Sequence, residues 1–304
     1  MLSKPISKLF AFLWPLAALF FLAVSPARAQ IPGPEFDTLQ GARSMGLGRA
    51  FSALADDPSA VRINPAGLSQ AQAFTAGVSY QRNTDELNQH SFHLVDAKTT
   101  QMAVGLSYSI VNDNVLAVAG NDYDDAPVFS YLSLGLADST IEKFKLGLTV
   151  SWLRVDNHLP DVPTATHDIE LTVGALIPFK DFFGLQIGLV GRNLLGENDR
   201  YLARHFEVSA AGTPFKILRF AGAVQIDATS KEDADMGYGF GGEVEFVKNL
   251  RVRTGFRRDV GTRDHFLGGG VGFEGTEGGL IYAYERNLSL DTNQHMVELF
   301  FRWL

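Results

Sequence analysis

The chain contains no cysteine among its 304 residues. This absence excludes structural disulfides, cysteine-based metal sites and thiol catalysis. The chain also lacks an excess of positive charge, because its 26 lysine and arginine residues are outnumbered by 34 aspartate and glutamate residues, for a net charge of −8. A mildly acidic protein is a poor partner for nucleic acid, so we expect no nucleic-acid binding.

Long apolar runs are also missing, except at the N-terminus. Residues 1–29 have two early lysines, an apolar stretch over Leu9–Val24 and the sequence Ala27-Arg28-Ala29, which matches a cleavage site. This pattern is typical of a secretory signal peptide. The alternative is a membrane-spanning helix, which needs roughly 20 apolar residues and therefore a longer run. We predict export, with a mature chain that begins at Gln30.

The rest of the chain alternates between apolar and polar residues. In residues 144–152 and 236–246, apolar side chains occupy nearly every second position, and polar residues or glycines lie between them. A period of two over about ten residues is typical of a strand with one apolar face. About fourteen segments after residue 70 share this pattern. Such strands fit either a soluble sandwich or a membrane barrel whose apolar face contacts lipid.

Connection lengths and the last strand favour the barrel. Long connections, such as 111–126 and 156–166, alternate with tight ones, such as Lys98-Thr99 and Val247–Asn249. Outer-membrane barrels show this alternation, with the tight turns in the periplasm. The final segment, 294–303, is rich in aromatic residues, as the last strand of such barrels usually is. We therefore predict an all-β fold, a transmembrane antiparallel β-barrel of about 14 strands.

Gly41–Leu68 does not follow the strand pattern. Glycines and other small residues dominate it, which allows backbone to pack closely against backbone. Asp57-Pro58 and Asn64-Pro65 each place an N-cap residue before a proline, so we expect each pair to begin a very short helix. Gly67 is placed to end the second helix. The segment is therefore predicted to be compact and partly helical.

Three elements of this segment carry a family resemblance: Gly41-Ala42-Arg43-Ser44-Met45-Gly46-Leu47-Gly48, Ala55-Asp56-Asp57-Pro58-Ser59-Ala60 and Asn64-Pro65-Ala66-Gly67-Leu68. In this order they resemble the N-terminal signature of the long-chain fatty acid transporter family of outer-membrane proteins (FadL/TodX type), including its PorV-like relatives. The chain departs from the signature at Arg49, where a small residue is usual, and at Val61-Arg62-Ile63, where aromatic residues are common. The resemblance implies that residues 30–70 form a plug, or hatch, inside a fourteen-stranded barrel of residues 71–304.

The resemblance and the strand pattern indicate three sets of candidate site residues. The plug or gating set is Arg43, Met45, Gly46, Gly48, Arg49, Asp56, Asp57, Arg62, Asn64, Pro65 and Gly67. A hairpin centred on Lys248 pairs Glu245 with Arg251 and Glu243 with Arg253, which predicts a charge ladder facing the lumen. This ladder either holds the lumen and the plug or selects a permeant. The apolar residues of the longest outer loop either capture a ligand or anchor the loop on the rim; they are Val111, Val115, Leu116 and Val118.

The sequence offers little for catalysis or cofactor binding. Two matches to G-x-G-x-x-G begin at Gly237 and Gly270, but neither opens a helix that could present its N-terminus to a pyrophosphate. Glycines in strands mark bends or close approach to the plug instead. The seven histidines show no metal-ligand spacing. Asn121–Asp125 suits either calcium or a solvated acidic loop. We predict no enzyme activity, no cofactor and no metal site.

With the resemblance, these features predict a barrel of the bacterial outer membrane for passive uptake of hydrophobic small molecules past the plug, by a lateral opening in the wall. Two alternatives stay open: a PorV-like barrel that docks secreted or surface proteins without transport, and a purely structural barrel. The expected partners are outer-membrane lipid, a hydrophobic ligand and a secreted or surface protein. A wide apolar pocket above the plug favours uptake, whereas a sealed lumen beneath an exposed apolar patch favours docking.

Overall fold

The computed structural model describes residues 39–71, 73–84, 88–99, 101–112, 128–138, 140, 143–156, 165–179, 182–195, 203–228, 235–260 and 262–303. The predicted signal peptide, residues 1–29, lies outside them. The helices are α2 (Ala42–Gly46), α3 (Ala60–Ile63) and the 3-10 helix η2 (Pro65–Gln70). Among the described residues, no helix is long and apolar enough to cross a membrane.

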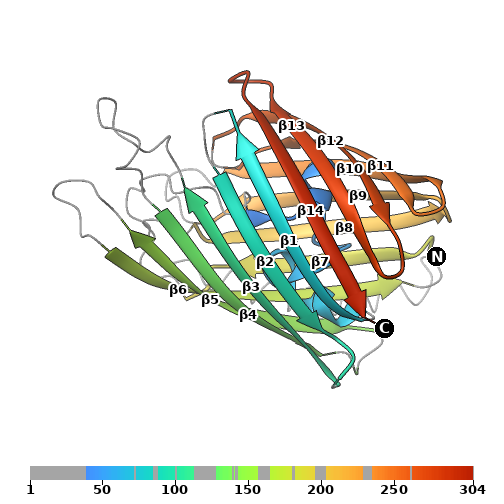
Figure 1. Cartoon of the computed structure of the whole chain (residues 1–304), viewed down its shortest axis with the longest axis horizontal. Coiled ribbons are helices and arrows are strands. Elements are labelled where there is room, and N and C mark those ends of the chain that lie inside the picture. Colours follow the sequence, from blue (N-terminus) through green and yellow to red (C-terminus); the bar gives the residue numbers. More distant parts are fainter. Residues whose placement is uncertain are drawn as a thin grey trace, which may run out of the picture.

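Fourteen strands form a closed antiparallel barrel, in which each strand pairs with its neighbours in sequence (Figure 1). The first and last strands close the barrel, with Phe74 opposite Trp303. This architecture confirms the predicted antiparallel β-barrel and its strand number. The strands are β1 (Phe74–Asn83), β2 (Asn88–Asp96), β3 (Met102–Asn112), β4 (Val128–Asp138), β5 (Lys145–Asp156), β6 (Ala165–Phe179), β7 (Leu185–Arg192), β8 (His205–Phe215), β9 (Leu218–Asp227), β10 (Met236–Val247), β11 (Leu250–Arg258), β12 (His265–Glu274), β13 (Gly278–Asn287) and β14 (Asn293–Trp303).

The two ends of the barrel differ in their connections. At one end, which we call the short-turn end, tight turns join β2 to β3, β8 to β9, β10 to β11 and β12 to β13. The start of β1 and the end of β14 lie at the same end. At the other end, the long-loop end, the connections include residues 113–127 between β3 and β4. The alternation predicted from the sequence is therefore present.

The outer face of the wall is apolar, whereas its inner face combines polar side chains with buried apolar clusters. Outward-facing Val78, Leu134 and Phe240 are 49%, 51% and 55% exposed, whereas inward-facing Ser133 and Glu298 are 0% and 1% exposed. A soluble sandwich buries its apolar face, but this barrel presents that face to its surroundings. The pattern is that of a barrel whose outer surface contacts lipid.

Residues 39–71, which we call the inner segment, lie within the barrel (blue in Figure 1). Helix α2 contacts β11 to β14, and η2 contacts β3 to β6. Leu47, Phe51 and Leu68 form a buried apolar cluster that includes wall residues. The inner segment therefore touches both halves of the wall and has its own core.

Of the two helix starts predicted at Asp57-Pro58 and Asn64-Pro65, the structure confirms the second. Asn64 caps η2, because its side chain accepts the Ala66 N–H, and Pro65 is the first helical residue. The other prediction is wrong: after Asp57-Pro58 the chain makes a turn, and α3 begins only at Ala60. The Asp57 carboxylate caps that turn by accepting the Ser59 N–H at 2.9 Å.

Gly67 does not end the second helix, since η2 continues to Gln70. The glycine serves close packing instead. A Cβ at Gly67 would lie 2.0 Å from the carbonyl oxygen of Ala55, a distance that real Cβ atoms do not reach. Tertiary contact therefore explains this glycine, and local helix termination does not.

Candidate functional site

Glycines of the wall face the backbone of the inner segment. A Cβ on Gly147 of β5 would lie 2.3 Å from the carbonyl carbon of Pro65, and one on Gly255 of β11 would lie 2.2 Å from the amide nitrogen of Gly48. No larger residue fits at either position unless backbone moves. The close approach that strand glycines indicated is thus present on two sides of the barrel.

Asn64 joins three parts of the structure. Its Nδ2 donates to the carbonyl oxygens of Ser52 at 2.9 Å and Ala175 of β6 at 3.3 Å. Its Oδ1 accepts the Ala66 N–H at 3.1 Å. The side chain is fully buried and has no access to solvent, so these bonds within the protein satisfy its polar atoms.

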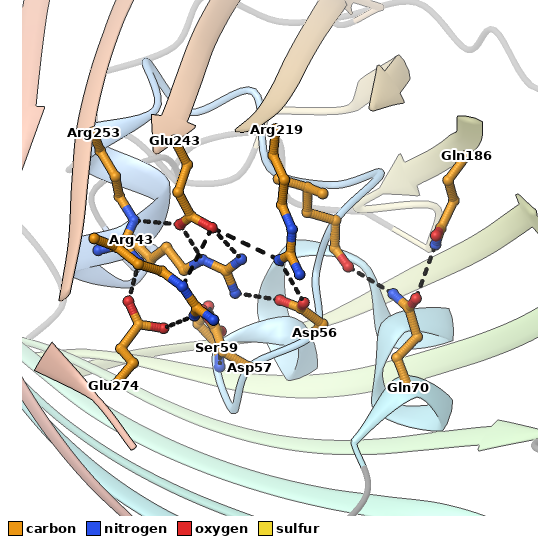
Figure 2. A network of polar contacts seen from close by, with 12 residues as sticks. Arg43, Asp56, Asp57, Ser59, Gln70, Gln186, Arg219, Glu243, Arg253 and Glu274 are labelled. Carbon is orange, nitrogen blue, oxygen red and sulfur yellow. Dashed lines mark hydrogen bonds and ion pairs between the residues drawn. The ribbon is translucent and has the colours of Figure 1, made fainter. Parts of the chain in front are cut away.

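Helix α2 is attached to the wall by a set of charged residues that we call the α2 network, shown in Figure 2: Arg43, Asp56, Arg219, Glu243, Arg253 and Glu274. Arg43 Nε donates to Glu243 Oε2 at 3.0 Å, and Arg43 also pairs with Asp56. Arg253 Nε donates to the same Glu243 oxygen at 2.6 Å. Because Arg43, Glu243 and Arg253 are almost completely buried, each charge depends on the others for its stability.

Two neighbouring carboxyl groups of the inner segment respond oppositely to this environment. Burial favours a higher pKa for Asp56, but the guanidinium groups of Arg43 and Arg219 outweigh burial and hold that pKa below its usual value. Burial raises the pKa of Asp57, and the charge of Arg43 and the hydrogen bonds with Ser59 compensate only in part. Asp56 therefore ionises more readily than an ordinary aspartate, and Asp57 less readily.

The wall part of the network follows the predicted register. Glu243 lies opposite Arg253 and Glu245 lies opposite Arg251, the pairs expected for a hairpin centred on Lys248. Sequence reasoning missed Glu274, which accepts from Arg251 Nη1 at 2.7 Å. The sequence held a signal for it: Glu274 and the inward-facing Phe266 are an even number of residues apart in β12, so both lie on the same face of the strand.

A second network lies nearer the long-loop end. Arg49 pairs with Glu285 of β13 at 3.3 Å, and Arg257 Nε donates to Glu285 Oε1 at 3.0 Å. Arg257 also pairs with Asp259 at 2.5 Å. Gly48, at φ +61°, turns the chain here, and its Cβ position would lie 2.5 Å from the carbonyl oxygen of Phe256. The departure at Arg49 from the family signature therefore meets an acidic partner in the wall.

Arg62 attaches α3 to the opposite wall. Its Nη1 donates to Ser133 Oγ of β4 at 3.0 Å, and its guanidinium lies 4.7 Å from the ring centre of Tyr131. Nearby, Arg192 of β7 donates to the Ile63 carbonyl oxygen at 2.8 Å. These contacts hold the C-terminal end of α3 against the wall.

The remaining residues of the plug or gating set lie in apolar or backbone contacts. Met45, 2% exposed, packs with Ile281 and Phe300. A Cβ at Gly46 would lie 3.3 Å from Arg253 Cβ. Each member of the set therefore contacts the wall or another part of the inner segment.

The predicted capture loop is only partly described, and one member needs correction. Val111 lies within β3, not in the loop, and is fully buried in a cluster with Leu39 and Phe129. It faces inward because β3 extends to Asn112 and keeps its alternation. Val115, Leu116 and Val118 lie outside the described residues, as does the acidic stretch Asn121–Asp125.

A cavity of about 310 Å³ opens at the short-turn end between the inner segment and the wall. Charged residues such as Arg43, Asp56, Arg219 and Arg251 line it. It is therefore not the wide apolar pocket above the plug that favours uptake. In the described ranges, no three His, Asp or Glu side chains come together as a metal site.

Comparison with solved structures places this architecture among known barrels. The chain is similar to the toluene transporter TbuX of Ralstonia pickettii, at 11% identity and a TM-score of 0.65 over 87% of this chain and 98% of that one. A FadL homologue of Pseudomonas aeruginosa matches at 10% identity and 0.64, over 87% and 98%. The toluene transporter TodX of Pseudomonas putida matches at 9% and 0.63, over 86% and 98%. No protein-family model and no curated protein sequence matches.

At such low identity these likenesses show the fold. The resemblance predicted from the N-terminal signature is confirmed at that level, since the matched chains are aligned over nearly their whole length. The matched proteins are transporters and their homologues, and none of these three is described as an enzyme.

Proposed function

We propose that this protein is an outer-membrane barrel for the passive uptake of hydrophobic small molecules. The observation that carries the proposal is the likeness, across nearly their full length, to two toluene transporters. The apolar outer face of the wall and the even strand number support a place in the outer membrane, with the short-turn end toward the periplasm.

The proposal divides the chain into three parts. Residues 1–29 are a signal peptide that is removed on export. Residues 30–70 act as a plug, and residues 71–304 form the barrel. The plug role is supported by the burial of the inner segment and by its contacts with wall strands from β3 to β14. An intact mass for the purified protein that begins at Gln30 tests the first division.

The route past the plug is proposed to run sideways through the wall between β6 and β7. Their ladder covers only Val173–Phe179 of β6. Beyond it, the Leu194 N–H donates to the Leu171 carbonyl at 2.9 Å, and Ala165–Glu170 has no described ladder partner on the β7 side. Among the described residues, β6 thus forms a shorter ladder with β7 than with β5, and a shorter ladder opens more easily.

The second candidate is a barrel that docks secreted or surface proteins without transport. The close fit of the inner segment favours it, because Arg43, Arg49 and Arg62 are all buried and bonded to wall residues. A plug attached in this way need not move at all. A purely structural barrel is the third outcome of the same experiment.

The chain allows a clean test because it has no native cysteine. Ser52 of the inner segment and Ser209 of β8 have their Oγ atoms 2.6 Å apart. The double variant Ser52→Cys/Ser209→Cys should therefore form a disulfide that locks the plug to the wall. Uptake of radiolabelled toluene by cells that make the barrel is measured with the lock oxidised and reduced, beside Ser52→Cys alone.

Uptake by the wild-type barrel above that of cells without it supports transport. A loss on oxidation, restored on reduction, shows that the plug moves, whereas uptake that ignores the lock shows that a path exists beside a fixed plug. No uptake above background, together with a protein partner retained on purification, transfers the assignment to docking. No uptake and no partner leaves the structural barrel.

A further inference from the structure

More arginines than carboxyl groups line the cavity at the short-turn end. Four arginines and three carboxyl groups line it, the latter from Asp56, Asp57 and Glu274. The cavity is reachable from solvent, because the side chains of Arg219 and Asp56 are 33% and 31% exposed. Arg43, Arg219 and Arg251 each pair with carboxylates, so Arg302 is the lining cation that could bind an anion entering from the short-turn end.

Arg302 of β14 differs from the other three lining arginines, each of which forms an ion pair with a carboxylate. Its Nη1 donates to the Gly275 carbonyl oxygen at 3.2 Å, and its guanidinium lies 4.5 Å from the ring centre of Phe300. Among the residues that the structure describes, it has no acidic partner. A guanidinium supported on an aromatic ring and lacking a carboxylate has donors left for a ligand.

The strand register places a polar and an apolar contact beside Arg302. Thr75 of β1 lies opposite Arg302 on one side and opposite Val95 of β2 on the other. All three line the cavity, as does Ala73 just before β1. Thr75, Val95 and Ala73 are 4%, 1% and 2% exposed. One row across three strands thus offers a cation, a hydroxyl and an apolar surface.

We propose that this cavity is a binding site for a small organic carboxylate. The carboxylate is bound by Arg302 and Thr75, and a short apolar body packs against Val95 and Ala73. The site lies at the opposite end of the inner segment from the proposed entry of hydrophobic compounds, and it does not depend on their uptake.

The test is isothermal titration calorimetry, in which benzoate is added to the full mature barrel in lipid nanodiscs. The heat measured with empty nanodiscs is subtracted to remove the contribution of benzoate partitioning into lipid. We expect saturable binding near one benzoate per chain. Arg302→Gln should weaken binding about tenfold or more, since it removes a charge-assisted bond. Arg302→Lys should lose less, because it keeps the charge. Arg286→Gln is the matched control, as Arg286 lies at the long-loop end and pairs with Asp291.

Two further probes define the ligand class. Benzyl alcohol has the same ring without the charge and should bind far more weakly than benzoate, while inorganic phosphate has charge without the ring and should compete poorly. Benzoate that does not saturate, or affinity unchanged by Arg302→Gln, overturns the proposal. Equal binding of benzyl alcohol overturns the role of the carboxylate, and stronger binding of phosphate identifies a simple anion site instead.

Discussion

Arg43 of α2 and Glu243 of β10 are 200 positions apart in the sequence and form a buried ion pair with 3.0 Å between Nε and Oε2. Glu243 also accepts from Arg253 of the neighbouring strand. One wall carboxylate thus compensates charges from both the inner segment and the barrel. Its neutralisation should loosen the inner segment without removing any strand pairing.

Glu243→Gln should lower the free energy of unfolding by about 3–5 kcal/mol, because it leaves buried guanidinium groups without compensation. Urea titration of the barrel in lipid vesicles measures the change. Glu245→Gln is the control, since that side chain is 33% exposed and its ion pair with Arg251 spans 3.6 Å. Exposed pairs contribute about 0–1 kcal/mol. Equal losses in the two variants would show that the buried pair of Glu243 with Arg43 contributes no more to the free energy of unfolding than the exposed pair.

Gly147→Ala should displace η2 from the wall, because the added Cβ would lie 2.3 Å from the Pro65 carbonyl carbon. Overpacking of this kind costs about 1–3 kcal/mol. Faster hydrogen exchange at the amides of residues 65–70 reports the displacement. Gly222→Ala, where the nearest atom is 3.8 Å away, should leave that exchange unchanged. Unchanged exchange in Gly147→Ala as well contradicts the close approach.

Asn64→Asp should destabilise the inner segment more at pH 8 than at pH 5. The amide donates to two carbonyl oxygens, and a carboxylate in its place would face both without a proton. The expected loss at pH 8 is about 1–3 kcal/mol. At lower pH the new carboxyl gains a proton, donates again and recovers part of this loss. Limited proteolysis of the inner segment at both pH values tests the difference, and equal sensitivity would falsify the assigned bonds.

Asp57 should make the inner segment less stable as pH rises. Its folded pKa is raised, so its contribution is complete below the unfolded value of about 3.9 and is lost as pH increases through the folded value. Asp57→Asn keeps an acceptor for Ser59 and does not titrate. It should match the wild type near pH 4 and exceed its urea midpoint at pH 8.

Asp56 gives the opposite control. Its folded pKa is lowered, so its contribution is present above about pH 3.9 and is lost as pH falls through the folded value. Asp56→Asn should therefore be less stable than the wild type at pH 7 and approach it in acid. Parallel curves for Asp56→Asn and Asp57→Asn would show that the two carboxyl groups share one environment, contrary to the structure.

The barrel could be predicted well from the sequence because the alternation of apolar and polar residues within each strand identifies its two faces. Alternation over 236–246 placed Glu243 and Glu245 inward, and the short hairpin then determined which arginine each one faces. These are local properties, since register follows from turn length and residue parity. The number of strands followed from counting such segments.

The inner segment was less predictable because its structure depends on tertiary contacts. No side chain of the residue before α2 caps this helix. Its first N–H, that of Ala42, donates instead to Oε2 of Glu298 in β14, at 2.9 Å. Gly67 has a local interpretation as a helix end and a tertiary one as a packing contact, and the tertiary one applies. Glu274 has the inward parity of β12, but its contact with Arg251 runs diagonally across the strand pair, and a rule that pairs only opposed residues missed it.

The contacts of α2 also constrain the order of assembly. This helix lies near the N-terminal end of the described residues, yet the strands that it touches, β11 to β14, are the last strands to be synthesised. Helix α2 can therefore make these contacts only after β11 to β14 exist, and a chain cut short before β11 would lack the surface on which α2 packs.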